Sequence, residues 1–342
     1  MSETPSQMGA ESRETPAVLR RQAETLAPRI AELVAVLRKK SPQVVVTCAR
    51  GSSAHAATFG KHLIERHIGI AVSAAAPNVV SVYRRSLALK DQLFLAISQA
   101  GRSEDLVETA AMARSSGAIT VAVVNDSGSP LAQTCDIVLP IEAGAELSVA
   151  ASKSFIASLA VLLRLSAAWR DDADMQQSLQ RLPERLAAAM ELDWSASLAN
   201  LTNASSVITI GRGPTLAIAR EAALKLKEAC NLHAEAFSSA EFQHGPMALI
   251  EQAYPVLLFA PTDEAASGIE TLRVDLARKG ASVFSTERLD GAAFLPTLAP
   301  DQPDADAICQ IQTFYQLLLR IAERRGSDVD RPRHLKKVTT TR

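Results

Sequence analysis

The stretch VVVTCARGSSAHAATFGKHL, residues 44–63, decides the fold class. It begins as a short β-rich run, turns at Gly51 and two serines, and continues with the spacing of a helix. The apolar residues of the run do not alternate with polar ones, which is typical of a strand buried on both faces of a parallel sheet. A strand followed directly by a helix therefore predicts one repeat of an α/β fold.

The second half of the chain repeats this pattern. The run ARGSSAHAA at 49–57 matches GRGPTLAIA at 211–219, and LFLAIS at 93–98 matches VLLFAP at 256–261. The members of each pair are about 162 residues apart, and the pairs come in the same order. Because strands alternate with helices between the matched runs, we expect a duplicated α/β unit in which each half has a parallel sheet flanked by helices.

The predicted domain boundaries follow from this duplication. The start is polar, a helix precedes the first strand, a charged helical stretch lies between the halves, and the end is basic. The chain divides into five segments. They are a flexible N-terminus at 1–16, a first domain at 17–170, a helical connector at 171–200, a second domain at 201–325 and a tail at 326–342.

Composition excludes several classes of function. The formal net charge of -1 argues against a nucleic-acid or anionic-membrane partner, which favours a basic excess. The N-terminal residues lack the apolar region of a signal peptide, and no run of about 18 apolar residues occurs. We therefore expect a cytoplasmic protein without a membrane span. The cysteines are far apart and form no CxxC pair, so we expect reduced, buried thiols and neither zinc site nor disulfide. They are Cys48, Cys135, Cys230 and Cys309.

Two loops that follow strands are rich in serine and glycine. Ligands of open α/β sheets bind at the carboxyl ends of the strands, where a helix N-terminus offers free N–H groups to a phosphate. The loop residues are Gly51, Ser52 and Ser53 after the first strand, and Ser98, Gln99, Gly101, Arg102 and Ser103 after a later one. Helix capping by serine is the alternative, and the residues alone leave both interpretations open. Nucleotide binding is not predicted, because there is no P-loop and GRGPTL lacks the third glycine of GxGxxG.

A charged helix in the second half has two interpretations as well. In LAIAREAALKLKEAC, residues 216–230, Glu221, Lys225 and Glu228 share one stripe at i, i+4 and i+7. Such a stripe is typical of a solvent-exposed face, where a Glu–Lys pair contributes about 0.2–0.5 kcal/mol. Together with His244 in EFQHGP, the stripe would instead supply the charged groups of an acid–base site. Spacing alone does not show that these side chains converge.

Four motifs carry a resemblance to a known family: AELSVAASKSF, EAALKLKEACNLHAEAF, EFQHGPMALI and DVDRPRHLKKVT. Over residues 40–342 the chain resembles tandem sugar isomerase (SIS) domain proteins. Among these it is similar to the isomerase half of glutamine–fructose-6-phosphate amidotransferase and to free-standing glucosamine-6-phosphate deaminases. The resemblance implies two SIS domains, each a flavodoxin-like three-layer sandwich. It also implies a homodimer whose active site is shared between subunits.

The resemblance further implies roles for individual residues. The family grips the sugar phosphate with the two serine loops, at positions that match Ser52, Ser53, Ser98, Gln99 and Ser103. Gly51, Arg102 and Val149 are expected to contact the substrate. The sequence departs from the family at Ala100 and Ala151, which replace serines, and at Arg102, which replaces a glutamate.

The catalytic residues are carried over in the same way. The glutamate that moves protons in the family matches Glu228, and its charged companions match Glu221 and Lys225. The ring-opening histidine, which reaches the neighbouring subunit's site, matches His244. The lysine of the closing tail matches Lys337, with Lys336 beside it as the alternative.

These roles imply that glucosamine 6-phosphate is converted to fructose 6-phosphate and ammonia by aldose–ketose proton transfer, without metal or cofactor. Two alternatives stay open. One is a deaminase or deglycase for a related sugar phosphate, and the other is a non-catalytic sugar-phosphate sensor, although no helix-turn-helix is found. Nothing before residue 40 resembles a glutaminase domain, so glutamine-dependent synthesis is not expected of this chain alone.

Overall fold

The computed structural model describes residues 6–337 and divides the chain into two compact units. The first-sheet unit comprises Thr15–Glu146, Lys153–Gln180 and the tail from Lys336. The second-sheet unit comprises the described residues up to Glu14, together with Leu147–Ser152 and Arg181–Leu335. The outer ends of the predicted N-terminal segment and tail, residues 1–5 and 338–342, lie outside the described residues.

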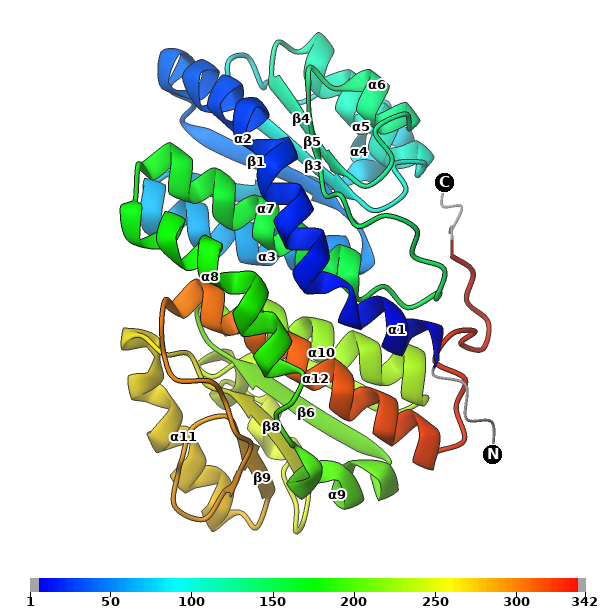
Figure 1. Ribbon diagram of the computed structural model, residues 1–342, viewed down its shortest axis with the longest axis vertical. Coiled ribbons are helices and arrows are strands. Elements are labelled where there is room, and N and C mark those ends of the chain that lie inside the picture. Colours follow the sequence, from blue (N-terminus) through cyan, green and yellow to red (C-terminus); the bar gives the residue numbers. More distant parts are fainter. Residues whose placement is uncertain (1–5, 338–342) are drawn as a thin grey trace. The chain divides into compact units, whose positions relative to one another are not determined.

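The first-sheet unit is built around five parallel strands in the order β2–β1–β3–β4–β5 (Figure 1). The register places Val45 opposite Leu93 and Leu93 opposite Ile119. Every residue of β4 is buried, as expected for a strand covered on both faces. The strands are β1 Val44–Ala49, β2 Ala71–Ala74, β3 Leu93–Ser98, β4 Ile119–Val124 and β5 Ile137–Pro140.

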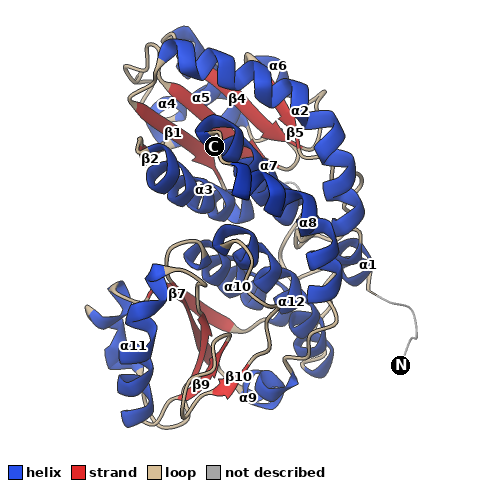
Figure 2. Ribbon diagram, turned by 60° about the vertical axis from the view of Figure 1, so that its left-hand side comes forward, coloured by secondary structure: helices blue, strands red, loops and turns tan. Residues whose placement is uncertain are grey.

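Helices cover both faces of this sheet (Figure 2). On one face lie α2 Thr15–Lys40, α3 Gly51–Leu63 and α7 Lys153–Arg170, which pack on one another. On the other lie α4 Pro77–Ser81, α5 Glu104–Ser115 and α6 Pro130–Thr134, over a core that contains Phe94 and Leu106. A π-helical turn, Ile64–Ile68, extends α3, and α8 Ala173–Ala189 leads into the second-sheet unit.

The second-sheet unit has its own parallel sheet, in the order β7–β6–β8–β9–β10. Read in chain order within each half, this is the strand order of the first sheet. The predicted duplication and the α/β class with two flanked parallel sheets are therefore confirmed. The strands are β6 Ser206–Gly211, β7 His233–Ser238, β8 Pro255–Phe259, β9 Ser282–Ser285 and β10 Ala293–Phe294.

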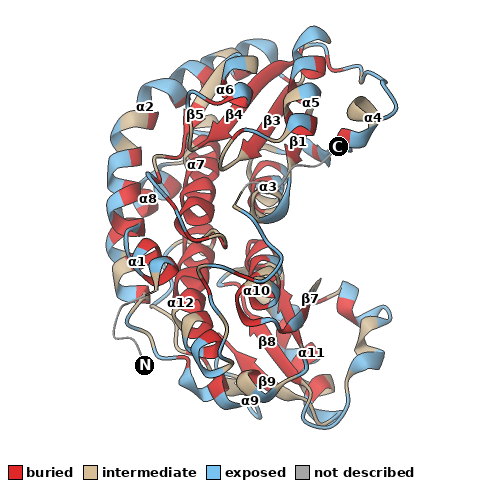
Figure 3. Cartoon of the chain, turned by 90° about the vertical axis from the view of Figure 1, so that its right-hand side faces the viewer, coloured by how far each residue is buried: buried red, intermediate tan, exposed pale blue. Residues whose placement is uncertain are grey.

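One face of the second sheet is covered by α10 Thr215–Cys230 and α12 Pro303–Arg324, and the other by α11 Ser267–Arg278 (Figure 2). Helix α9 Leu198–Asn203 packs on α12. Short 3-10 turns are found at Ser195–Ser197, Glu241–Gln243, Pro246–Leu249 and Glu264–Ala266. The helices α7 and α12 are buried along most of their length (Figure 3).

The N-terminal segment differs from the sequence-based expectation. Residues Gln7–Arg13, within the range expected to be flexible, form helix α1. The hydroxyl of Ser6 caps this helix by accepting a hydrogen bond from the Gly9 N–H at 3.1 Å, and Met8 is fully buried. Few apolar residues mark α1 in the sequence. The helix is held instead by polar groups that bond to segments distant in the chain, and a sequence pattern does not display such bonds.

All four cysteines are buried. Burial raises the pKa of each thiol, those of Cys48, Cys135, Cys230 and Cys309, to about 12. The thiols therefore stay protonated at neutral pH and are poor nucleophiles. Between residues 6 and 337 no helix is both long and apolar enough to cross a membrane, and no cluster of side chains suits a metal ion.

Candidate functional site

The two serine loops of the first-sheet unit lie at the same edge of its sheet. Strands β1 and β3 are parallel neighbours, so the loops after Ala49 and after Ser98 emerge side by side. Helix α3 begins at Gly51, which has a φ of 52°, and carries Ser52 and Ser53 in its first turn. The N–H groups of this turn have no partners within the helix and can face an anion.

Ser103 is the N-cap residue of α5, but its side chain makes no capping hydrogen bond. Ser52 and Ser53 stand inside the first turn of α3, whose N-cap is Arg50. The hydroxyl of Ser98 accepts the Gly101 N–H at 3.1 Å, which is a bond within the loop and not at a helix N-terminus. Helix capping by the side chain therefore explains neither Ser98 nor Ser103.

Gly101 holds the second loop in a shape that other residues cannot adopt. Its φ is 63°, and a Cβ atom placed on it would lie 2.2 Å from the Ser129 hydroxyl oxygen. We expect Gly101→Ala to lower the free energy of unfolding by more than about 1 kcal/mol, because strain and overlap both oppose the substitution. Urea denaturation would measure this, with Gly268→Ala, where no atom lies within 4 Å, as the matched control. Equal stability of both variants would contradict the expectation.

Two arginines flank these loops and both have acidic partners. Arg50 donates to Asp105 in the first turn of α5, with Nη2 2.5 Å from Oδ2, and so ties the first loop to the helix after the second. Arg102 donates to Asp126 at 2.9 Å, and both side chains are exposed. An exposed ion pair contributes only about 0–1 kcal/mol, so a phosphate can compete with Asp126 for Arg102.

In the corresponding loop of the second-sheet unit, the polar groups form hydrogen bonds with the backbone of the same unit. Thr215 takes the place of Ser53 in the internal repeat, and its hydroxyl donates to the Phe259 carbonyl at 2.6 Å. The same oxygen accepts the Arg212 N–H at 3.0 Å. These bonds occupy the ends of β6 and β8, so the open serine loops belong to the first half of the repeat.

Helix α10 follows from local sequence signals. Its residues are mostly Ala, Leu, Lys and Glu, which are strong helix formers. The helix ends at Asn231, which has a left-handed φ of 50° and is one of the residues that tolerate this conformation at a helix C-terminus. Gly213, with a φ of 55°, allows the sharp turn between β6 and the helix. A Cβ atom on Gly211 would lie 2.2 Å from the Thr215 carbonyl oxygen.

The stripe on α10 is an ion-paired triad of side chains. The Lys225 ammonium lies 3.3 Å from Glu221 Oε1 and 2.6 Å from Glu228 Oε2. The side chains of Glu221 and Lys225 are 0% and 1% exposed, whereas that of Glu228 is 22% exposed. The solvent-exposed interpretation of the stripe is therefore wrong for Glu221 and Lys225. Of the two carboxylates in the stripe, Glu228 is the one that combines contact with the buried ammonium and access to solvent.

Burial and charge act in opposite directions on Lys225. Burial disfavours the ammonium, but the carboxylates of Glu221 and Glu228 favour it more, and the pKa of Lys225 is raised above its usual value. The side chain is therefore a fixed positive charge at neutral pH. It holds the Glu228 carboxylate in one orientation.

The other predicted residues of the second-sheet unit lie outside this triad. His244 follows the 3-10 turn Glu241–Gln243 and is exposed. Val149 lies in the loop at 147–152, and its N–H donates to the Asp330 carbonyl at 3.1 Å. Ala151 occupies the same loop.

Lys337 lies in the first-sheet unit, where its ammonium is 3.3 Å from Glu146 Oε2. Glu146 is buried and also accepts hydrogen bonds from the N–H and hydroxyl of Ser154, at 3.1 and 2.5 Å. Lys336 is exposed. Of the two adjacent lysines, Lys337 is therefore the one with a buried acidic partner.

The predicted residues are thus divided between two units. The first-sheet unit contains both serine loops and Lys337, whereas the second-sheet unit contains Val149, the α10 triad and His244. The structure brings together the members of each serine loop and of the triad.

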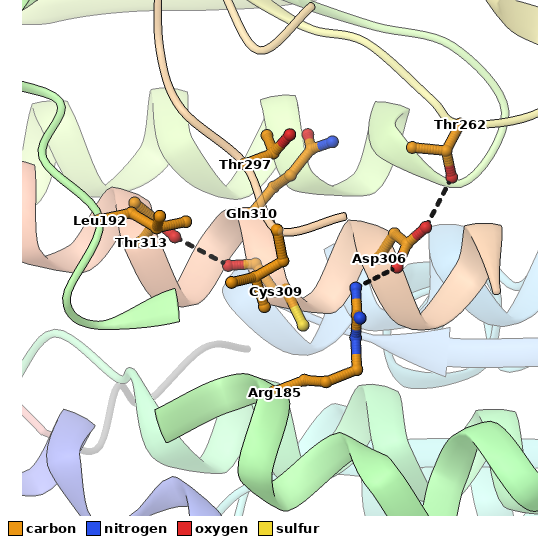
Figure 4. Close-up of a pocket in the computed structure, with 9 residues that line it drawn as sticks. Arg185, Leu192, Thr262, Thr297, Asp306, Cys309, Gln310 and Thr313 are labelled. Atoms are coloured by element: carbon orange, nitrogen blue, oxygen red, sulfur yellow. Dashed lines mark hydrogen bonds and ion pairs between the residues drawn. The ribbon is translucent and has the colours of Figure 1, made fainter. Parts of the chain in front are cut away.

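A small cavity of the second-sheet unit contains none of the predicted residues (Figure 4). It is lined by Arg185, Thr262, Asp306 and Gln310, among others. Arg185 pairs with Asp306 at 2.7 Å, and Thr262 donates to Asp306 at 2.8 Å. The volume that the centre of a water molecule can occupy in this cavity is about 10 Å³. This is space for about one water molecule and far too little for a sugar phosphate.

Comparison with known proteins assigns the chain to a family. The SIS domain model matches residues 37–168 and 200–286, with one match in each half. The chain belongs to the SIS-domain family. The first matched range contains β1–β5 and the second contains β6–β9, so each SIS domain corresponds to one sheet, with β10 just beyond the second range.

Curated relatives of this SIS protein include the isomerizing glutamine–fructose-6-phosphate aminotransferases of Caulobacter vibrioides and Symbiobacterium thermophilum. They are 32% identical over 319 residues and 35% identical over 320 residues. Each match covers 86% of this chain and 51% of the relative. The chain thus spans about half the length of the curated relatives it matches.

Solved structures show the same fold. A Silicibacter pomeroyi protein described as a candidate phosphosugar isomerase is 40% identical, with a TM-score of 0.91 and coverage of 95% of this chain and 100% of that one. The glucosamine-6-phosphate deaminase of Thermotoga maritima shares the fold at 21% identity, with a TM-score of 0.72 and coverage of 96% and 100%.

Several residues that contact the predicted site residues were not found from the sequence. Asp105 and Glu146 each hold a predicted loop or side chain, and Glu11 and Asp330 bond to the loop that contains Val149. Glu146 lies within the motif AELSVAASKSF, which gave it some signal. Glu11 had none, because it falls in the segment that was expected to be flexible.

Proposed function

We propose that this SIS protein is an amino-sugar-phosphate deaminase that converts glucosamine 6-phosphate and water to fructose 6-phosphate and ammonia. The observation that carries the proposal is the α10 triad. A partly exposed carboxylate, Glu228, is fixed at 2.6 Å from a buried ammonium, Lys225. A proton carrier requires this combination of access and fixed orientation.

The serine loops are proposed to bind the 6-phosphate. The N–H groups at the start of α3 and the hydroxyls of Ser53 and Ser103 supply donors without bulk. Ser52, Ser98 and Gln99 are proposed to complete the set, as in the family that the chain resembles. Gly51 permits close approach of the backbone, and Arg102 would exchange Asp126 for the phosphate.

The proposed proton path starts after the sugar ring has opened. Glu228 takes the proton from C2, and the electron pair of the C2–H bond forms the C1–C2 double bond. The π pair of the C1 carbonyl moves to O1, which takes a proton from water, so the intermediate is an enolamine with a hydroxyl on C1. Glu228 then returns the proton to C1, which leaves a protonated imine at C2. Water adds to this imine and ammonia departs, so the products are fructose 6-phosphate and ammonia. One carboxylate serves both carbons because they are adjacent.

The remaining residues are assigned supporting roles in this proposal. His244 moves protons for ring opening and acts in the site of a partner copy, which makes the active unit a homodimer. Lys337 contacts the open-chain carbonyl, and Val149 contacts the sugar. Because Lys225 is bound between two carboxylates, we assign it to holding Glu228, and Glu221 to holding Lys225.

The test is an assay of the wild-type protein with three substrates. We expect equal amounts of ammonia and fructose 6-phosphate from glucosamine 6-phosphate, and a much higher KM for glucosamine, which lacks the phosphate. Ammonia from galactosamine 6-phosphate alone would favour the deaminase for a related sugar. Binding of the sugar phosphates without ammonia release would contradict the proposal and favour a sensor.

A further inference from the structure

We propose that Glu11 and Asp330 are positioning residues that fix the substrate-contacting loop at 147–152. The inference rests on the proposed function, because that function makes Val149 of this loop a substrate contact. Helix α1, the loop and the chain near Asp330 belong to the same unit, and Figure 1 shows α1 beside the C-terminal segment. Three segments that are far apart in the sequence therefore meet at one place.

Glu11 is a buried carboxylate that accepts hydrogen bonds from the loop. Its side chain accepts hydrogen bonds from the N–H of Leu147 and from the hydroxyl of Ser148, and the Ser148 N–H lies 3.4 and 3.3 Å from its two oxygens. Glu11 is only 4% exposed. Burial of a carboxylate is costly unless hydrogen bonds compensate it, so the loop must keep these donors in place.

Asp330 binds both helix α1 and the loop at 147–152. Its two carboxylate oxygens each accept a hydrogen bond at 2.8 Å, from the N–H groups of Gln7 and Met8 at the start of α1. Its backbone carbonyl accepts the Val149 N–H at 3.1 Å. One residue thus secures the helix that carries Glu11 and also binds the loop directly.

The loop therefore has three consecutive N–H groups bound by distant segments. Leu147 and Ser148 donate to Glu11, and Val149 donates to Asp330. Apolar packing does not fix the start of the loop, because Leu147 is 64% exposed. Inside the loop, the Ser148 hydroxyl also lies 3.2 Å from the Ala150 carbonyl. Hydrogen bonds to Glu11 and Asp330 therefore hold the backbone on the N-terminal side of Val149 and at Val149 itself.

The first test uses the ligand-free protein, so it does not depend on activity. Glu11→Gln keeps the size of the side chain but replaces one accepting oxygen by an NH2 group, which cannot accept these bonds. We expect amide hydrogen exchange in a peptide covering 147–152 to become at least tenfold faster than in wild type. A peptide within α7 should be unchanged. Glu24→Gln, which changes an exposed carboxylate on α2, is the matched control.

The second test measures substrate use. We expect Glu11→Gln to raise KM for glucosamine 6-phosphate about tenfold with little change in kcat, because a loop contact with the sugar is weakened equally in ground and transition states. If Glu11→Gln does not fold, Ser148→Ala removes one donor and should give a smaller change in the same two measurements.

Unchanged exchange of the loop amides would overturn the inference, whatever the activity. Faster exchange with unchanged KM would overturn the link between the loop and the substrate. A wild-type protein that releases no ammonia would instead overturn the proposed function, and the exchange experiment would still show whether Glu11 fixes the loop.

Discussion

Replacement of Glu228 by Gln is expected to lower kcat for ammonia release about 10²–10⁴-fold while KM for glucosamine 6-phosphate changes little. The amide keeps the shape of the side chain but cannot take the C2 proton. It can still face Lys225, which lies 2.6 Å from the carboxylate in the wild type. Steady-state assay of ammonia and of fructose 6-phosphate would measure both constants.

A matched control separates loss of catalysis from loss of structure. Glu323→Gln makes the same change at an exposed position of α12, and it should leave kcat and KM unchanged. Glu228→Gln should also keep its circular dichroism spectrum, because the side chain is partly exposed. Near-normal turnover of Glu228→Gln would remove Glu228 from the central role.

The second large effect is a loss of folding stability when Lys225 is replaced. Lys225→Met should lower the free energy of unfolding by about 3–5 kcal/mol, because removal of one partner of a buried ion pair leaves the other charge uncompensated. The charge left behind is Glu221, whose side chain is fully buried and 3.3 Å from the ammonium. Urea denaturation followed by circular dichroism would measure the change.

A double variant tests the cause of this effect. Glu221→Gln in the Lys225→Met background removes the buried charge, so the double variant should be more stable than Lys225→Met alone. A Lys225→Met protein within about 0.5 kcal/mol of wild type would show that the pair is not buried in solution.

The raised pKa of Lys225 predicts how this contribution depends on pH. A group whose pKa is higher in the folded than in the unfolded chain stabilises the fold fully below its unfolded value, which is about 10.4 for lysine. The contribution is lost as pH rises through the folded pKa. The difference in stability between wild type and Lys225→Met should therefore be constant near neutrality and shrink in strong alkali.

The fold could be predicted from the sequence because its signals are local. Residues 44–63 contain a strand, a glycine turn and a helix, and the matching run at 211–219 reveals the duplication. The apolar run of β3 and the Gly101 turn follow from the same signals. Each of these depends on neighbours in the chain, which a sequence displays directly.

The character of the site could not be predicted in the same way. The stripe of Glu221, Lys225 and Glu228 has the same spacing on an exposed helix as on a buried one. Burial is decided by segments distant in the sequence, such as α12, which packs on α10. Glu11 illustrates the same limit, because its partners at 147 and 148 lie more than a hundred residues away.

The central claim is that Glu228 carries a proton from C2 to C1 of the amino sugar phosphate. The most direct measurement follows deuterium from glucosamine 6-phosphate labelled at C2. The account predicts slower turnover than for unlabelled substrate and deuterium at C1 of the fructose 6-phosphate, with any remainder in solvent. Both effects should require Glu228. Equal turnover of labelled and unlabelled substrate, with deuterium still bound at C2 of the deaminated product, would contradict the account.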